Sequence, residues 1–164
     1  ITMYGMYPSE EVQKDKVPLK PALGLKSFVT YVKELGPGEE ISYGGTYVTE
    51  RTMRIATVAV GYGDGYPRSL SNCGYVLICG KRARILGRVC MDQLMVDVTD
   101  IMEADVDTPV TLIGKDGDEE ITMEHLAELC GGFHYEMVCD IGKRVPRVYY
   151  RGGKVVGTMD CFAE

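Results

Sequence analysis

Hydrophobic residues in this chain occur in short runs that are separated by turn-forming residues. The runs are rich in Val, Ile, Tyr or Thr, and Gly, Pro, Asp or Asn stand between them. Those that we predict to contain β-strands are ALGLKSFVTYVKEL, RIATVAVGY, YVLICG, ARILGRV, LMVDVTDI, PVTLIG and RVPRVYYRGGKVVGT. In the last run, Gly152 and Gly153 fit the two-residue turn of a hairpin. Short strands with frequent turns predict a mainly β fold, an antiparallel barrel or sandwich.

One short helix is predicted, at residues 122–130. Thr122 can cap its beginning, and Leu126 and Leu129 give it an apolar stripe. Gly131 can end it, because glycine readily takes the left-handed conformation that follows many helices.

The composition is that of an ordinary globular protein, with 45% apolar and 26% charged residues. The chain of 164 residues contains no internal repeat, linker or low-complexity tract, so residues 1–164 are predicted to form a single domain. The net charge of −6 argues against a nucleic-acid partner, because phosphate binding needs clustered Lys and Arg. No apolar run approaches the roughly 20 residues of a membrane span, and no signal-peptide pattern is present.

The six cysteines form no C-x-x-C pair and show no zinc-finger spacing, so no metal site is expected. Free thiols are typical of a reducing compartment, which predicts a cytoplasmic protein. The chain begins with Ile rather than Met. We therefore expect it to be a fragment whose beginning was removed.

Two glycines, Gly44 and Gly45, directly follow Tyr43 in the segment ISYGGTY. Glycine is favoured where the backbone takes a positive φ or is closely approached. One interpretation is an ordinary turn with a tyrosine packed beside it. The other is a backbone shaped to hold the phenol at a reaction centre, and these residues alone leave both open.

Three further segments carry polar residues that could belong to a site. VGYGDGYPR, residues 60–68, lacks the last glycine step and the following helix of a dinucleotide-binding loop, so it is predicted to be a tight turn. In GRVCMDQ, residues 87–93, Cys90 and Met91 are typical core residues. FHYEMVCDIGKRVPRVYY, residues 133–150, is predicted to be an edge strand with exposed arginines. Each segment taken by itself favours a structural role.

The order of six segments changes this picture: YGMYPS, ISYGGTY, VGYGDGYPR, GRVCMDQ, HYE and RVPR. From Ile1 almost to its C-terminus, the chain resembles the C-terminal β domain of bacterial alanine racemases, which are fold-type III pyridoxal-phosphate enzymes. The resemblance implies that an N-terminal (β/α)8 barrel, absent from this chain, supplies the Schiff-base lysine and most of the cofactor pocket. The isolated chain is then expected to be inactive.

The resemblance also implies roles for individual residues. Tyr43 corresponds to the second acid/base, opposite the lysine, in the interconversion of L-alanine and D-alanine that supplies peptidoglycan. Racemisation removes a proton from one face and returns one on the other, so it needs two bases. In the head-to-tail homodimer of the family, Tyr43 would reach the active site of the other subunit. The residues that correspond to the substrate corridor and carboxylate site are Tyr62, Arg68, Arg88, Cys90, Met91 and Asp92.

Three residues are implied at the cofactor: Ile1 through its backbone amide, Tyr135 at the phosphate and substrate gate, and Arg147 near the site. Tyr135 favours alanine as substrate, because related serine racemases tend to carry a smaller polar residue at that position. Two alternatives remain. One is a serine or broad-specificity racemase of the same fold, and the other is a non-catalytic β module that acts only in association.

Overall fold

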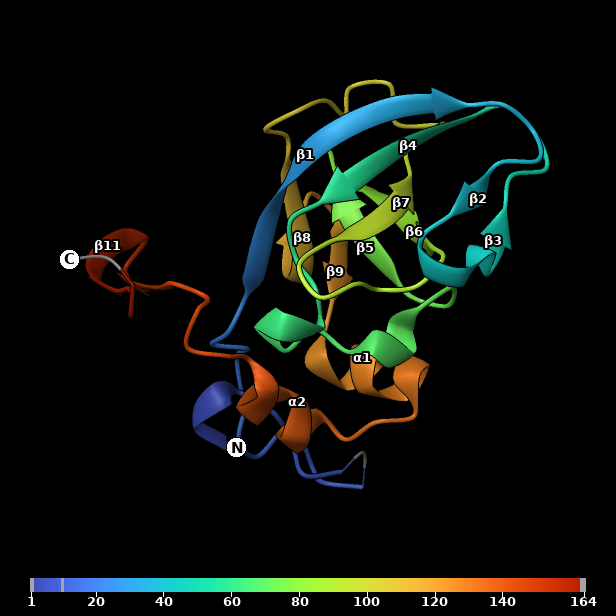
Figure 1. Ribbon diagram of the computed structural model, residues 1–164. Helices are drawn as coiled ribbons and strands as arrows, with labels where there is room; N and C mark the ends of the chain where they lie inside the picture. The colour runs from blue at the N-terminus through green and yellow to red at the C-terminus, as the bar shows by residue number, and fades with distance from the viewer. Residues whose placement is uncertain (1, 10, 163–164) are drawn as a thin grey trace.

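The computed structural model describes residues 2–9 and 11–162. Its main feature is a seven-stranded antiparallel sheet with the order β1-β4-β7-β6-β5-β8-β9 (Figure 1). The strands are β1 (Leu25–Leu35), β4 (Met53–Val58), β5 (Tyr75–Ile78), β6 (Lys81–Leu86), β7 (Leu94–Asp97), β8 (Pro109–Asp116) and β9 (Glu119–Ile121). One half of β1 pairs with β4 and the other half with β8, so the sheet closes on itself. The predicted mainly β, barrel-like fold is confirmed.

The pattern of side chains in β1 explains how one strand serves both halves of the sheet. Leu25, Ser27 and Val29 are buried while Lys26 is exposed, which is the period of two expected for a strand with one face on a core. The register against β4 then shifts between Val29 and Tyr31. Such a bulge bends a strand and increases its twist, which helps the sheet to close.

The described residues also form two small hairpins and four short 3-10 helices. In the C-terminal hairpin, Gly152 and Gly153 take φ values of 56° and 76°, so the predicted two-residue turn is confirmed. Figure 1 shows this hairpin projecting away from the barrel. The bounds are β2 (Glu40–Ile41), β3 (Tyr47–Val48), β10 (Arg147–Arg151), β11 (Lys154–Met159), η1 (Thr2–Tyr4), η2 (Tyr43–Gly45), η3 (Tyr62–Asp64) and η4 (Arg68–Leu70).

The predicted helix is present as α1, Met123–Cys130. The Thr122 hydroxyl accepts a hydrogen bond from the N–H of His125 at 3.1 Å, and Gly131 follows with a φ of 64°. Both ends are therefore set by local chemistry that the sequence displays. No helix in the described part of the chain is long and apolar enough to cross a membrane.

A second helix, α2 (His134–Asp140), corrects the prediction for residues 133–150. The edge strand expected there begins only at β10, Arg147–Arg151. Met137 and Val138 of α2 are buried in the same hydrophobic cluster as α1. Seven residues are too few to form a stable helix in isolation, so packing against the core stabilises this one.

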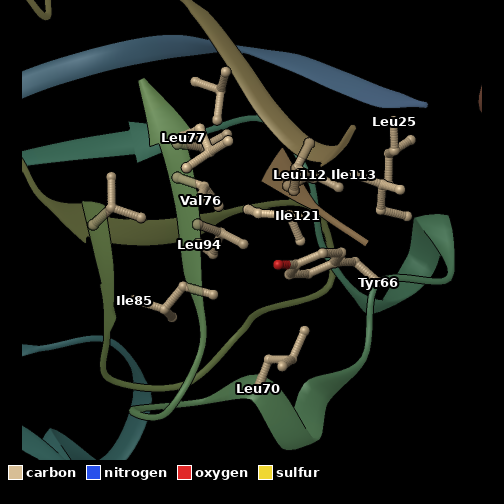
Figure 2. Packing of buried hydrophobic residues seen from close by; sticks show 14 of the residues in the cluster. Leu25, Tyr66, Leu70, Val76, Leu77, Ile85, Leu94, Leu112, Ile113 and Ile121 are labelled. Atoms are coloured by element: carbon tan, nitrogen blue, oxygen red, sulfur yellow. The ribbon is translucent and has the colours of Figure 1, made fainter. Parts of the chain in front are cut away.

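The barrel is filled by aliphatic side chains around one tyrosine, Tyr66. Figure 2 shows its ring among Leu70, Leu94, Leu112 and Ile121. Tyr66 is 2% exposed, and its hydroxyl has no hydrogen-bond partner among the residues that the structure describes. Burial raises the pKa of this phenol, so it stays protonated at physiological pH.

Removing the Tyr66 hydroxyl should stabilise the chain. We expect Tyr66→Phe to raise the free energy of unfolding by about 1 kcal/mol, because it keeps the ring and eliminates a buried hydroxyl without a partner. Urea unfolding of the chain measures this difference. Tyr31→Phe, at an exposed tyrosine of β1, is the control and should change nothing. A loss of stability in Tyr66→Phe would contradict the assignment of an unpaired hydroxyl.

Candidate functional site

Tyr43 begins η2, in the loop that joins β2 to β3, and is 74% exposed. Gly44 and Gly45 take φ values of 74° and 53°. A side-chain carbon at Gly44 would lie 3.2 Å from the Arg88 guanidinium, and one at Gly45 would overlap the carboxylate of Glu40. Both the positive φ values and the close neighbours favour glycine. The loop therefore presents the phenol to the outside instead of packing it against the turn.

The connection between β6 and β7, residues 87–93, lies against the Tyr43 loop. A side-chain carbon at Gly87 would lie only 2.7 Å from Cβ of Ser42, so the two segments meet without space between them. The Ser42 hydroxyl donates a hydrogen bond to the Arg88 carbonyl oxygen at 2.7 Å and lies 3.4 Å from the sulfur of buried Cys90. ISYGGTY and GRVCMDQ therefore form one surface.

Tyr62, the first residue of η3, is attached to the same connection. Its N–H donates to the Cys90 carbonyl oxygen at 3.0 Å, and the N–H of Gly63 donates to the Met91 carbonyl oxygen at 2.9 Å. Tyr62 and Met91 are 44% and 53% exposed. The N–H of Met91 has no acceptor within residues 2–9 and 11–162. This amide can therefore donate a hydrogen bond to a ligand.

Arg144 fixes the loops of Tyr62 and Met91 to each other. Its Nε donates to Asp64 at 2.6 Å, and its Nη2 donates to Asp92. Hydrogen bonding to Asp64, and then to Asp92, raises the pKa of the guanidinium, which stays charged. The sequence prediction placed Arg144 only among exposed strand arginines. Its two partners are 80 and 52 residues away in sequence, so complementary charge was the only signal that could have indicated the contact.

Two further arginines border the surface formed by these loops. Arg88 follows Gly87, and Arg68 begins η4. Ser71 joins η4 to the β6–β7 connection, since its hydroxyl donates to the Arg68 carbonyl and accepts from the N–H of Val89 at 3.0 Å. Both guanidiniums are exposed, and neither forms an ion pair with a described residue. Each of these two guanidiniums is a local positive charge that can attract a carboxylate.

Tyr135 and Arg147 do not belong to the surface around Tyr43. Tyr135 lies in the first turn of α2, where its ring stacks on Phe133 with centroids 4.6 Å apart. Arg147 donates to the Ile141 carbonyl oxygen at 2.9 Å. Figure 1 shows α2 beside the N-terminal segment, on a different side of the barrel from the β2–β3 loop. Ile1 lies outside the described residues.

The residues of the Tyr43 loop and of the β6–β7 connection have the chemistry to bind a carboxylate and to exchange a proton near it. A free amide at Met91 and the guanidinium of Arg88 suit a carboxylate, and the phenol of Tyr43 can donate or accept a proton. The surface therefore offers one group, the Tyr43 phenol, that can exchange a proton with a bound ligand.

Comparison with known proteins identifies the family to which the chain belongs. The sequence model of the family "Alanine racemase, C-terminal domain" matches residues 22–149. Alanine racemase 1 of Clostridium acetobutylicum is 47% identical over 156 residues, which are 95% of this chain and 40% of the relative. The alanine racemase of Desulforamulus reducens is 51% identical over 149 residues, 91% of this chain and 40% of the relative.

The solved structures that this chain resembles are also alanine racemases. The alanine racemase of Bacillus anthracis with bound L-Ala-P has a TM-score of 0.90 and 44% identity, over 97% of this chain and 41% of that chain. The alanine racemase of Clostridium difficile in complex with cycloserine has a TM-score of 0.90 and 39% identity, over 98% of this chain and 42% of that one. The chain thus spans about 40% of the length of the curated relatives quoted above.

Proposed function

Since the chain belongs to the alanine racemase C-terminal domain family, we propose that it forms part of an enzyme that interconverts L-alanine and D-alanine. The complete enzyme would consist of this chain joined to the N-terminal part that its relatives possess. The observation that carries the proposal is the contact of the loop of Tyr43 with the β6–β7 connection, which carries Arg88 and the exposed Met91. D-Alanine would supply peptidoglycan, and free thiols suit a reducing cytoplasm.

The residues present fit one end of a pyridoxal phosphate. Tyr135 has a hydroxyl with no partner among the described residues and would hold a phosphate oxygen, with the Ile1 amide as an expected further donor. Arg147 would act through the backbone at the end of α2, where it donates a hydrogen bond to the Ile141 carbonyl oxygen. The Schiff-base lysine would come from the N-terminal part. When bound, the cofactor ring would stabilise the negative charge left after the α-proton is removed.

Tyr43 would exchange a proton with the α-carbon on one face of the substrate. The Met91 amide and Arg88 would hold the substrate carboxylate, which fixes the α-carbon relative to the phenol oxygen. Tyr62 would narrow the entrance, and Arg68 would attract the anionic end of the amino acid. The base on the opposite face would be supplied by the N-terminal part.

We also propose a homodimer in which each Tyr43 serves the active site of the other subunit. Two observations support this arrangement. Tyr43 projects into solvent, with 74% of its surface exposed, so there is room for a partner to cover it. In addition, α2, which carries Tyr135, lies on a different side of the barrel from Tyr43. A single subunit would then contribute to two different sites.

Racemisation assays on the complete enzyme, supplied with pyridoxal phosphate, test the proposal and its broad-specificity alternative together. We expect alanine to be the preferred substrate and the chain alone to be inactive. Tyr135→Asn should increase the ratio of serine to alanine turnover by roughly tenfold, because a smaller residue leaves room for a hydroxymethyl group. The formation of D-serine and D-alanine measures this ratio. An unchanged preference would exclude Tyr135 as the selector, and a lack of alanine turnover in the complete wild type would contradict the proposed function.

A further inference from the structure

Ser42, the residue before Tyr43, has an unusual backbone conformation. Its φ is 66° and its ψ is 179°. This region is occupied almost only by glycine, because a side chain there crowds its own backbone. Gly44 and Gly45 meet their positive φ values without that cost. A serine at position 42 therefore keeps a strained backbone, and something must hold it there.

The Ser42 side chain supplies the restraint. Its hydroxyl donates to the Arg88 carbonyl oxygen at 2.7 Å and lies 3.4 Å from the Cys90 sulfur, in a half-buried position. Gly87 packs directly against Cβ of Ser42, so the serine cannot move toward the β6–β7 connection. A glycine would relieve the strain but could not form this bond. Serine at this position is therefore explained by its hydroxyl group and not by its backbone preference.

We propose that Ser42 is a positioning residue that sets the direction of the Tyr43 phenol relative to the Met91 amide. The hydrogen bond joins the residue before Tyr43 to the connection that carries Met91, and so spans the two groups that would act on one substrate. If the bond is lost, an alanine at position 42 can relax to an ordinary conformation, and a glycine can leave the observed one freely. Either change rotates the next peptide and redirects Tyr43. This inference rests on the proposed role of Tyr43.

Ser42→Ala and Ser42→Gly in the complete enzyme test the inference. In both variants we expect kcat for alanine to fall roughly 10- to 100-fold, because a small displacement of a reacting group has this effect. KM should change by less than about threefold, because the Met91 amide is retained. In Ser42→Gly the melting temperature should equal or exceed that of the wild type, because the strain is relieved. Amide hydrogen exchange at residues 43–46 should become faster in both variants.

The matched control is Ser27→Ala, because the Ser27 hydroxyl also donates to a backbone carbonyl, that of Ala59 at 2.8 Å, outside the site. It should lower stability and leave kcat unchanged. The positioning role would be overturned if Ser42→Gly kept the wild-type kcat. It would also be overturned if kcat fell only in those variants whose melting temperature fell as well. Full activity of Tyr43→Phe in the same assays would instead contradict the proposed function, so the two failures are distinguishable.

Discussion

Replacing Tyr43 by phenylalanine should lower alanine turnover by the complete enzyme roughly 10²- to 10⁴-fold, the range for loss of a positioned acid/base. The variant removes a single oxygen from an exposed side chain, so the fold should not change. Because L- and D-alanine are equally stable, kcat/KM must fall equally in both directions. Whether Tyr43 acts on only one face of the α-carbon is therefore best tested by exchange of the α-proton with deuterated water.

In Tyr43→Phe, the rate at which the α-proton exchanges with solvent should differ between L-alanine and D-alanine. The remaining base should still exchange the α-proton of one enantiomer with retention of configuration, while exchange from the other enantiomer should be lost. Mass spectrometry after chiral separation measures both rates. Tyr31→Phe, at another exposed tyrosine, should keep wild-type kinetics. Turnover of Tyr43→Phe within threefold of the wild type would favour the alternative of a non-catalytic β module.

Gly61→Ala should have the next largest effect, through overlap at the site. Gly61 is buried, and its φ of −156° is open to any residue, so backbone strain is not the reason. The added carbon would overlap the carbonyl groups of Cys90 and Met91, which accept hydrogen bonds from Tyr62 and Gly63. Backbone atoms cannot move aside cheaply, so η3 and the β6–β7 connection would separate.

We expect Gly61→Ala to reduce kcat/KM for alanine roughly 100-fold, with a raised KM, because both Tyr62 and Met91 are displaced. Overpacking should also lower the free energy of unfolding by about 1–3 kcal/mol. Steady-state kinetics and urea unfolding measure the two effects. Gly36→Ala is the matched control, since its added carbon meets no atom within 4 Å. An unchanged KM in Gly61→Ala would show that the close packing of Gly61 does not position η3 and the β6–β7 connection for substrate binding.

Most of the barrel could be predicted because its signals are local. Alternation in burial, as in β1, and caps, as at Thr122, are visible in a few adjacent residues. The helix α2 could not be predicted, because it depends on the burial of Met137 and Val138 by residues elsewhere in the chain. The conformation of Ser42 has no sequence signal at all, since serine is not a residue expected at a positive φ.

In the candidate site, too, local features could be predicted and contacts between distant segments could not. From its own residues, GRVCMDQ indicated only core packing, and buried Cys90 agrees with that prediction. Met91 does not, because it is exposed in the connection between β6 and β7, which lies against the loop of Tyr43. Closure of the barrel creates this neighbourhood by bringing two distant turns together. Arg144 was missed for the same reason, because its contacts with Asp64 and Asp92 exist only in the folded chain.

Hybrid dimers test most directly the central claim that Tyr43 works in the active site of the partner subunit. Inactive subunits of two kinds are mixed, one carrying Tyr43→Phe and one lacking the lysine of the N-terminal part that is proposed to form the Schiff base. If each site combines the lysine of one subunit with Tyr43 of the other, every hybrid dimer has one intact site, and alanine racemisation should return to about half of the wild-type rate per hybrid dimer. If hybrid dimers form and remain inactive, the two residues serve the same subunit, and the shared-site account is contradicted.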